Sequence, residues 1–334
     1  MAGNPKRIDD SFTILGLKVI ISVIGYENIG ESIVVFLQDG NTIIYTMVID
    51  SYLVKRKNQP ILNKTIDLLR QNHVERIDTL CWTHPHRDHS RGMLKLISDY
   101  CDSETLFIFP AYLTGPSLDN INLKNDELQM IQSILTANRD KSLKANQVAV
   151  VTSKYTTVDE FKLTNYYGDI ILNNIRIVAV TPDSSELLKQ VGIPVKRNPN
   201  DLSVSLVLLV DSYGFLFGAD TTNKHIDTCN KELLKKCRFV KIPHHASPTA
   251  NHLVSHLPSN LDAACTTLYN MGNAHLPDDN VIRQYKAMGT DVYVTGNKNR
   301  QKSGILYRIM TYIYDFSGSW PKISLDKSYC PVLL

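Results

Sequence analysis

Residues 83–92 read THPHRDHSRG and place His84, His86, Asp88 and His89 within six positions. Imidazole nitrogens and a carboxylate at this density are typical of a metal site, and a loop that is histidine-rich by chance is a poor alternative. The ligand types favour zinc, although manganese or iron would also accept them. In the turn, His84 and His86 can point the same way, while Asp88 and His89 reach a point further along. The spacing therefore predicts two adjacent metal ions.

Asp220 is the candidate that joins the two ions. It ends the sequence FGAD after an apolar run, where Gly218 and Ala219 allow a close approach of the backbone. A carboxylate can bind one ion with each oxygen and so hold two ions about 3.5–4 Å apart. An aspartate here also suits a turn or a helix N-cap, and for an isolated aspartate that use is the commoner one.

Two adjacent histidines, His244 and His245, follow the short apolar run at residues 239–242 and offer further ligands. Since successive side chains of a strand point to opposite faces, we expect only one of them to share a face with the cluster. The other would contact the substrate or support a ligand.

Short strands are expected to position these residues. Residues 18–25 and 32–37 are rich in β-branched side chains and predict a β-hairpin, and residues 42–49 predict a further strand that ends in Asp50. A short buried strand at residues 77–82 would deliver the histidine cluster onto a loop at its end. Chemistry is commonly found on such loops, because the sheet holds them rigidly.

The remaining patterns alternate with these strands in an α/β order. Helical patterns occur at residues 61–72, 93–100 and 123–145. The last of these is polar with an apolar stripe and predicts a surface insertion that would cover the site. Residues 169–179 resemble a hairpin with Asn173-Asn174 at its turn, and residues 203–210 and 214–218 predict a second pair of strands.

The composition of the 334 residues is that of an ordinary globular protein, with 43% hydrophobic and 21% charged residues. The formal net charge of +3 gives no strong field of the kind that marks a nucleic-acid binder. Six scattered cysteines without a C-x-x-C pair favour reduced thiols. We expect a cytoplasmic location without membrane association, because the first residues lack a continuous apolar stretch and no run approaches a membrane span.

The order of the segments VIGYENIGES, MVID, THPHRDHSRG, FGAD and PHHAS resembles the motifs of the metallo-β-lactamase-fold hydrolase superfamily. Asn200, Ser203 and the segment His275-Leu276-Pro277 are similar to its ComEC-like, competence-type subgroup. The resemblance spans about residues 18–296 and implies an α+β fold, a four-layer αββα sandwich with metals at one edge between two sheets. We expect an extension at 1–17, a hydrolase domain at 18–300 with a helical insertion at about 123–147, and a tail at 301–334 packed on the domain.

The resemblance also implies roles by position. It places first-metal ligands at His84 and His86, second-metal ligands at Asp88, His89 and His245, a bridging ligand at Asp220, and supporting residues at Asp50, Asn200 and Ser203. His245 is preferred over His244 because HHAS aligns with the subgroup's HHGS. The third histidine of the superfamily is missing, since no histidine lies between His89 and Asp220. The subgroup shares this loss, which leaves water, Asp183 or the substrate to complete the first site.

The resulting hypothesis is a hydrolase that holds a water between two zinc ions, lowers its pKa toward neutral and directs it at a phosphodiester. Asp88 would orient that water as well as bind metal, and His244 or His275 would stabilise or protonate the leaving group.

The substrate could be a small phosphodiester or a nucleic acid. Basic residues that could form a nucleic-acid track, although such sets more often form a solvated face, are Lys55, Arg56, Lys57, Arg87, Arg91, Lys298, Arg300 and Lys302. The alternative function is a partner-binding module of a multi-protein system, for example a defence system, with a partly degenerate metal site and the insertion as its protein contact. The oligomeric state is not indicated by the sequence.

Overall fold

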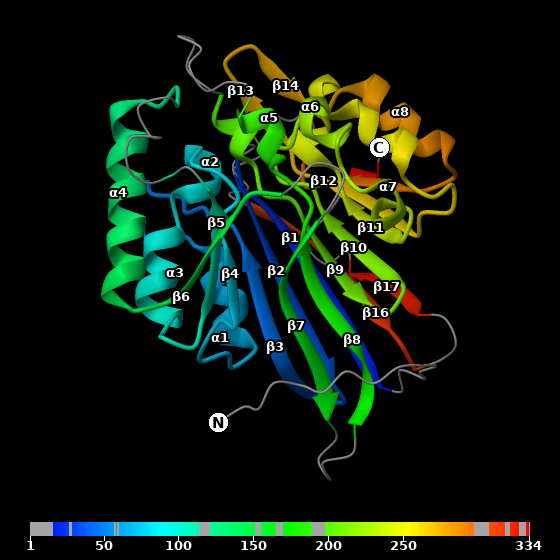
Figure 1. Ribbon diagram of the computed structural model, residues 1–334, viewed down its shortest axis with the longest axis horizontal. Coiled ribbons are helices and arrows are strands. Elements are labelled where there is room, and N and C mark those ends of the chain that lie inside the picture. The colour runs from blue at the N-terminus through cyan, green and yellow to red at the C-terminus, as the bar shows by residue number, and fades with distance from the viewer. Residues whose placement is uncertain are drawn as a thin grey trace.

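The computed structural model describes residues 16–26, 29–56, 58, 60–111, 113, 121–150, 155–164, 170–188, 198–296, 307–317, 321–326 and 332–333. Within these residues two eight-stranded sheets face each other (Figure 1). The first sheet contains, in spatial order, β17 (Lys322–Asp326), β16 (Tyr307–Asp315), β1 (Leu17–Tyr26), β2 (Gly30–Asp39), β3 (Thr42–Ile49), β4 (Thr79–Cys81), β5 (Leu106–Pro110) and β6 (Lys144–Val148). The second contains β18 (Val332–Leu333), β15 (Val292–Val294), β12 (Ala263–Thr266), β11 (Cys237–Lys241), β10 (Tyr213–Phe217), β9 (Leu206–Val210), β8 (Ile170–Ala179) and β7 (Thr156–Thr164).

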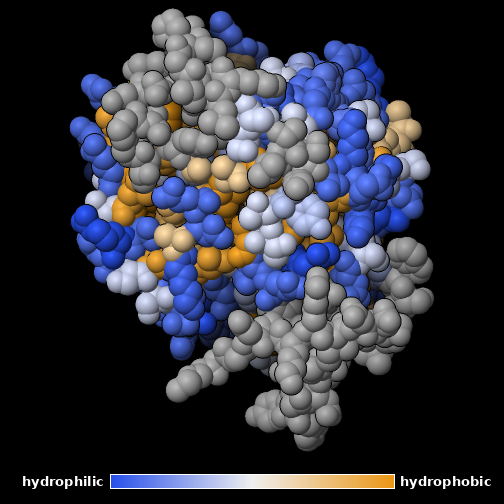
Figure 2. All heavy atoms as spheres, in the orientation of Figure 1, coloured by the Kyte–Doolittle hydropathy of each residue, from blue (hydrophilic) through white to orange (hydrophobic). Residues whose placement is uncertain are grey.

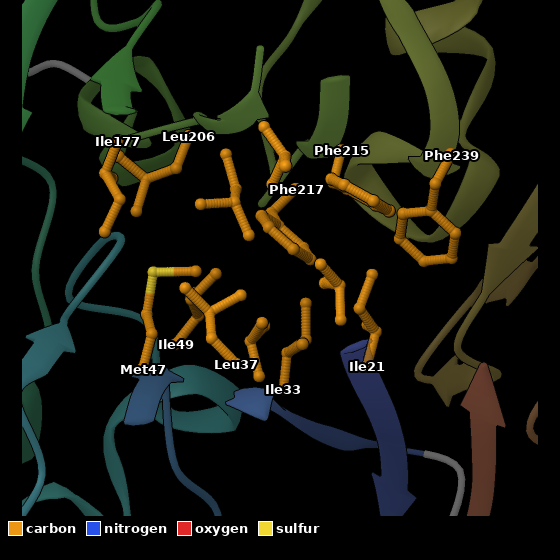
Figure 3. Close-up of a cluster of buried hydrophobic side chains, with 14 of the residues drawn as sticks. Ile21, Ile33, Leu37, Met47, Ile49, Ile177, Leu206, Phe215, Phe217 and Phe239 are labelled. Carbon is orange, nitrogen blue, oxygen red and sulfur yellow. The ribbon is translucent and has the colours of Figure 1, made fainter. Parts of the chain in front are cut away.

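An apolar core fills the space between the two sheets. Alternate residues of each strand point into this space, as the period of a β-strand requires. Figure 3 shows side chains of the first sheet directed at those of the second, with Ile21, Ile33, Leu37, Met47 and Ile49 facing Ile177, Leu206, Phe215, Phe217 and Phe239.

Helices cover the outer face of each sheet, because the strands are apolar on both faces. The outer face of the first sheet packs against α1 (Lys64–Gln71), α3 (Met93–Tyr100) and α4 (Asn125–Asp140). The outer face of the second packs against α6 (Asn223–Ile226), α7 (Lys231–Leu234), the 3-10 segment η4 (Pro248–His256) and α8 (Asp279–Ala287). In the orientation of Figure 1, Figure 2 shows apolar side chains across the middle of the face, between hydrophilic side chains on the helices at either side. The predicted α+β sandwich is confirmed.

Most of the predicted elements lie where the sequence patterns indicated. The N-terminal hairpin is β1 with β2, the two short helices are α1 and α3, and the second strand pair is β9 with β10. Residues 123–145 are helical over α4, but residues 144–148 form β6. The helix is not purely a surface insertion, because Ile131 and Ile134 are buried in the outer core of the first sheet.

The predicted hairpin at residues 169–179 is wrong. The chain continues through Asn173-Asn174 as the single strand β8, which pairs with β7 on one side and β9 on the other. Asparagine pairs suit turns, but a continuous strand gives the backbone a hydrogen-bonding partner on each side. Tertiary pairing therefore overrides the local turn preference here.

The C-terminal strands join both sheets. β16 pairs with β1, β17 pairs with β16, and β18 pairs with β15. The division of the chain into an extension, a domain and a tail stays a prediction, and residues 1–15 lie outside the described residues. In the described part of the chain, no helix combines the length and the apolar character needed to cross a membrane.

The strand order brings the predicted ligands to one end of the molecule. β3, β4 and β5 are parallel, as are β10, β11 and β12. Asp50 and Thr83 follow β3 and β4 in the first sheet, while Asp220, His244 and Thr267 follow β10, β11 and β12 in the second. Because the carboxyl ends of parallel strands share one edge of a sheet, these residues meet where the two edges face each other. In Figure 1 this end, at the top, carries α2 (Arg87–Ser90) and the hairpin of β13 (Tyr269–Met271) and β14 (Ala274–Leu276).

Candidate metal centre

Asp50 anchors the loop that carries the histidine cluster. Its φ of 57° lies in the left-handed region, which aspartate enters more readily than most residues. Its backbone amide donates to the Cys81 carbonyl at 2.8 Å. Its carboxylate accepts from the Thr83 amide at 2.8 Å and from the Thr83 hydroxyl at 2.7 Å. Asp50 is thus placed to fix the end of β4.

The same contacts orient two histidines. His89 Nδ1 lies 2.7 Å from Asp50 Oδ2, and His84 Nδ1 lies 3.0 Å from Thr83 Oγ1. Since the Thr83 hydroxyl already donates to Asp50, it accepts from His84. We infer that Nδ1 of each ring carries a proton, so that Nε2 of each neutral ring would be the ligand atom when a metal is bound.

Close approach of β10 and β11 positions Asp220. A Cβ on Gly218 would lie 2.8 Å from Pro243 Cβ and 2.9 Å from the Lys241 carbonyl oxygen, so only glycine fits. The His244 amide donates to the Ala219 carbonyl at 2.8 Å. The small residues of FGAD therefore allow the close backbone contact that the sequence predicted.

Four buried atoms converge on what we call the second position, namely Asp88 Oδ2, His89 Nε2, Asp220 Oδ1 and His245 Nε2, and all lie within 4.8 Å of one another. His89 Nε2 is 3.6 Å from each of the two carboxylate oxygens, and His245 Nε2 is 3.7 Å from each. Ligand atoms of a tetrahedral zinc ion lie about 3.3 Å apart. His89 Nε2, His245 Nε2 and Asp220 Oδ1 are buried and have no hydrogen-bond partner among the described residues. These unsatisfied atoms fit a metal ion at their centre.

Three atoms define the first position, namely His84 Nε2, His86 Nδ1 and Asp220 Oδ2. The two ring nitrogens are 3.1 Å apart, and His84 Nε2 lies 3.7 Å from Asp220 Oδ2. One oxygen of Asp220 therefore faces each position, which is the geometry of a bridging carboxylate.

The charges of the cluster depend on one another. Burial would raise the pKa of Asp220, but His245 and His89 hold it well below its ordinary value. Burial would lower the pKa of His89, but the carboxylates of Asp220, Asp88 and Asp50 raise it to about 10. The pKa of His84 is well below its ordinary value, because the ring is buried and lies beside His89. Without metal, His89 thus carries the positive charge that a cation would supply.

No family model and no curated protein matches the sequence. Among solved structures that match is a new diphosphatase from the PhnP family, with 10% identity and a TM-score of 0.39 over 83% of this chain and 85% of that chain. Similarity at this level assigns neither a family nor an activity to this chain.

Of the two adjacent histidines, only His245 belongs to a group of potential ligands, while His244 lies beside Asp220. Strand alternation does not apply, because the two residues form a left-handed turn in η3 (Pro243–Ala246), with φ of 50° and 52°. His245 is fully buried at the second position, and His244 Nε2 lies 4.0 Å from Asp220 Oδ2 with 21% of its side chain exposed. The structure thus places His245 among the potential ligands and His244 beside the first position.

Asn200 and Ser203 lie next to this turn. Asn200, in η2 (Pro199–Leu202), is buried and places its Nδ2 3.1 Å from His244 Nε2. Ser203 is buried, and its hydroxyl has no hydrogen-bond partner in the part of the chain that the structure describes. Asp183 instead caps α5 (Ser184–Leu188), where its Oδ1 accepts from the Ser185 amide at 2.9 Å. Its carboxylate belongs to neither group of potential ligands.

His275 is not brought to the cluster. It lies exposed on β14 opposite Asn270, and its Nδ1 contacts Asn270 Oδ1 at 2.6 Å. Neighbouring residues of a strand alternate in direction, so His275 and Asn270 share the face of the hairpin opposite to Tyr269. Tyr269 is the one that stacks on the His245 ring, with 4.9 Å between ring centroids.

Glu31 is a buried acidic residue of the centre that sequence reasoning missed. It lies on β2, its Oε1 accepts from Lys241 Nζ at 2.6 Å, and its Oε2 accepts from the Thr267 hydroxyl. Glu31 and Asp50 also form a group with His89, but they face its Nδ1 side, away from the second position. A charged residue inside the apolar strand sequence GESIVVFL was the signal that could have identified it.

A groove of about 700 Å³ opens beside the two positions. It is lined by Ile29, Tyr52, His86, Arg87, Asp88, Arg91, Asn122, Lys124, Asp126, Glu127, Asn198, Pro199, Asn200, Tyr269 and Met271. Of the predicted basic residues that the structure describes, Arg87 and Arg91 belong to this lining, whereas Lys55 and Arg56 are exposed elsewhere. The others, Lys57, Lys298, Arg300 and Lys302, lie outside the described residues.

Proposed function

We propose that the protein is a metal-dependent hydrolase that cleaves phosphodiesters at a centre of two zinc ions, with manganese or iron as alternative metals. The observation that carries the proposal is Asp220, whose Oδ1 faces His89 and His245 while its Oδ2 faces His84. Two ions bound there would polarise the phosphoryl oxygens and lower the pKa of an attacking water.

Two side chains of the protein would act on the attacking water and on the leaving oxygen. Asp88 belongs to the second position and also lines the groove, so it can accept a hydrogen bond from the attacking water. Burial lowers the pKa of His244, which is therefore neutral at pH 7. It lies beside the first position, where its Nε2 would contact the leaving oxygen in place of Asn200 Nδ2. His275 would take no part in these steps, because it faces away from the cluster.

We further infer the four-layer αββα arrangement of the metallo-β-lactamase fold, in its ComEC-like subgroup. Support comes from the order of the sequence motifs, and from two facing sheets with apolar clusters on both outer faces. A cytoplasmic location stays a prediction.

The groove limits the substrate that can reach the metals. Its volume falls in the range of small-ligand sites. Arg87 and Arg91 supply positive charge for a phosphate, and Tyr52 and Tyr269 supply flat apolar walls. We propose a small phosphodiester or a single-stranded nucleic-acid end as substrate. Cleavage of nucleic acid would fall steeply with salt, whereas cleavage of a small ester would not.

The test compares wild type with His86→Ala on bis-p-nitrophenyl phosphate and on labelled single- and double-stranded DNA, with zinc or manganese. Wild type should cleave only with metal, and His86→Ala should lose cleavage while it remains folded. His252→Ala is the matched control, because His252 is half-exposed and pairs with Asp227 away from the groove. Cleavage by His86→Ala at the wild-type rate would refute the proposal. A wild type that binds almost no metal but binds a partner protein would support the partner-binding alternative instead.

A further inference from the structure

A fully buried ion pair lies behind the ligands of the second position. Lys241 Nζ is 2.6 Å from Glu31 Oε1, and the two side chains are 0% and 2% exposed. Lys241 lies on β11 of the second sheet and Glu31 on β2 of the first, so the pair bridges the two sheets.

Stability alone does not account for this pair. Removing two charges from water costs about as much as their attraction returns, and apolar residues of similar volume are often as stable or more so. Ile33 and Val35, the next two residues on the same face of β2 as Glu31, are part of the apolar core between the sheets. An apolar pair at positions 31 and 241 would extend that core.

The contacts of Glu31 point to another role. Its Oε2 accepts from the hydroxyl of Thr267, and Thr267 Oγ1 lies 2.8 Å from His245 Nδ1. Because the hydroxyl proton is committed to Glu31, Thr267 Oγ1 accepts from His245. The proton of His245 is thereby held on Nδ1, and Nε2 is left for the ion.

The same carboxylate also lies behind the other histidine of the second position. Its oxygens are 3.5 Å from His245 Nδ1 and 3.9 Å from His89 Nδ1. A carboxylate behind a ligating imidazole raises the basicity of the ligand, and loss of such a partner costs about 10- to 100-fold in metal affinity. At the first position, His84 Nδ1 reaches Asp50 through the Thr83 hydroxyl in the same way. The first position differs in having three potential ligands, of which His86 is only partly buried.

We propose that Glu31 and Thr267 are positioning residues that make the second position the tighter of the two metal sites, and that Lys241 holds Glu31 in place. The proposal rests on the two-ion centre of the proposed function. It assigns a resident ion to the second position and an exchangeable ion to the first. Chelation should therefore remove the two ions in separate steps.

Thr267→Val breaks the hydrogen-bond chain from Glu31 through Thr267 to His245 with little change in side-chain shape. Metal-free protein is titrated with Co²⁺, whose visible absorption reports its ligands, and with Zn²⁺ against a chromophoric chelator. Thr267→Val should weaken the tighter step by about 10- to 100-fold and leave the weaker step unchanged. The matched control is Thr266→Val, because Thr266 is equally buried but its hydroxyl contacts, among the described residues, only the Thr267 carbonyl at 3.5 Å.

A second variant removes the charges. Glu31→Gln alone would leave the Lys241 ammonium buried without its counter-ion, so it is combined with Lys241→Met. This double variant should lose affinity in the tighter step as Thr267→Val does. Its control is Arg238→Met with Asp262→Asn, which removes a 2.8 Å ion pair at the other end of β11.

The outcomes separate this inference from the proposed function. Wild-type affinity in both Thr267→Val and the Glu31 double variant would overturn the inference while leaving the two-ion centre intact. Wild-type protein that binds no Co²⁺ or Zn²⁺ would instead refute the two-ion centre, and with it this inference.

Discussion

The second and first metal positions differ in how the protein holds their ligands. The second offers four buried atoms, and both of its histidines have a carboxylate behind them. The first offers three atoms, and its His86 is only partly buried. A closed, well-supported set of ligands favours tight binding, whereas an open set leaves room for substrate. The difference suggests a division within one centre, in which the second position retains its ion and the first position leaves room for the substrate.

Asp220→Ala should have the largest effect, because it removes an oxygen from both positions. We expect both ions to be lost and kcat/KM to fall by more than the roughly 100-fold that loss of an outer partner costs. Metal analysis after gel filtration, together with initial rates, checks this. Asp227→Ala, at a half-exposed aspartate outside the centre, serves as the control. Full retention of one ion in Asp220→Ala would show that Asp220 does not bridge.

His245→Ala and His86→Ala should separate the two positions. His245→Ala removes a ligand of the second position and should abolish the tighter step. His86→Ala should abolish only the weaker step, so that about one ion per chain remains. Isothermal titration of the metal-free variants measures both steps. Loss of the same step in the two variants would mean that the positions are not distinct.

Metal binding should release a proton from the second position. Metal-free His89 has a pKa of about 10, so it is protonated at pH 7 and must lose its proton to bind an ion. Affinity should therefore fall as the pH falls below that pKa. Titrations in buffers of different ionisation enthalpy should show about one proton released per ion in the tighter step. A heat of binding that is the same in all buffers would contradict the assignment of His89.

His275→Ala should have the smallest effect. His275 is exposed on the face of its hairpin opposite to Tyr269, so its loss should change kcat/KM and stability by no more than about 0.5 kcal/mol. His244→Ala gives the contrasting result, because His244 is beside Asp220 and its loss should lower kcat. A large loss of kcat in His275→Ala would show that the β13–β14 hairpin takes part in the reaction.

The local parts of the centre could be predicted from sequence. His84, His86, Asp88 and His89 lie within one loop, so their spacing alone shows that they converge. Asp220 was recognisable because small residues precede it at a strand end. These predictions needed only neighbouring residues and the direction of a strand.

The long-range parts could not be predicted in the same way. Glu31 meets Lys241 and Thr267 across the two sheets, at separations of 210 and 236 residues. Their pairing depends on the packing of β2 against β11, which no local pattern encodes. The left-handed turn at His244 and His245 likewise replaced the strand geometry that residues 239–242 suggested.

The most direct test of the two-ion centre is a competition titration of metal-free wild type with Zn²⁺, with the bound metal counted by elemental analysis. We predict two ions per chain that bind in two steps of different affinity. Binding of no zinc, or of one ion only, would contradict the assignment of Asp220 as a bridge between two metal positions.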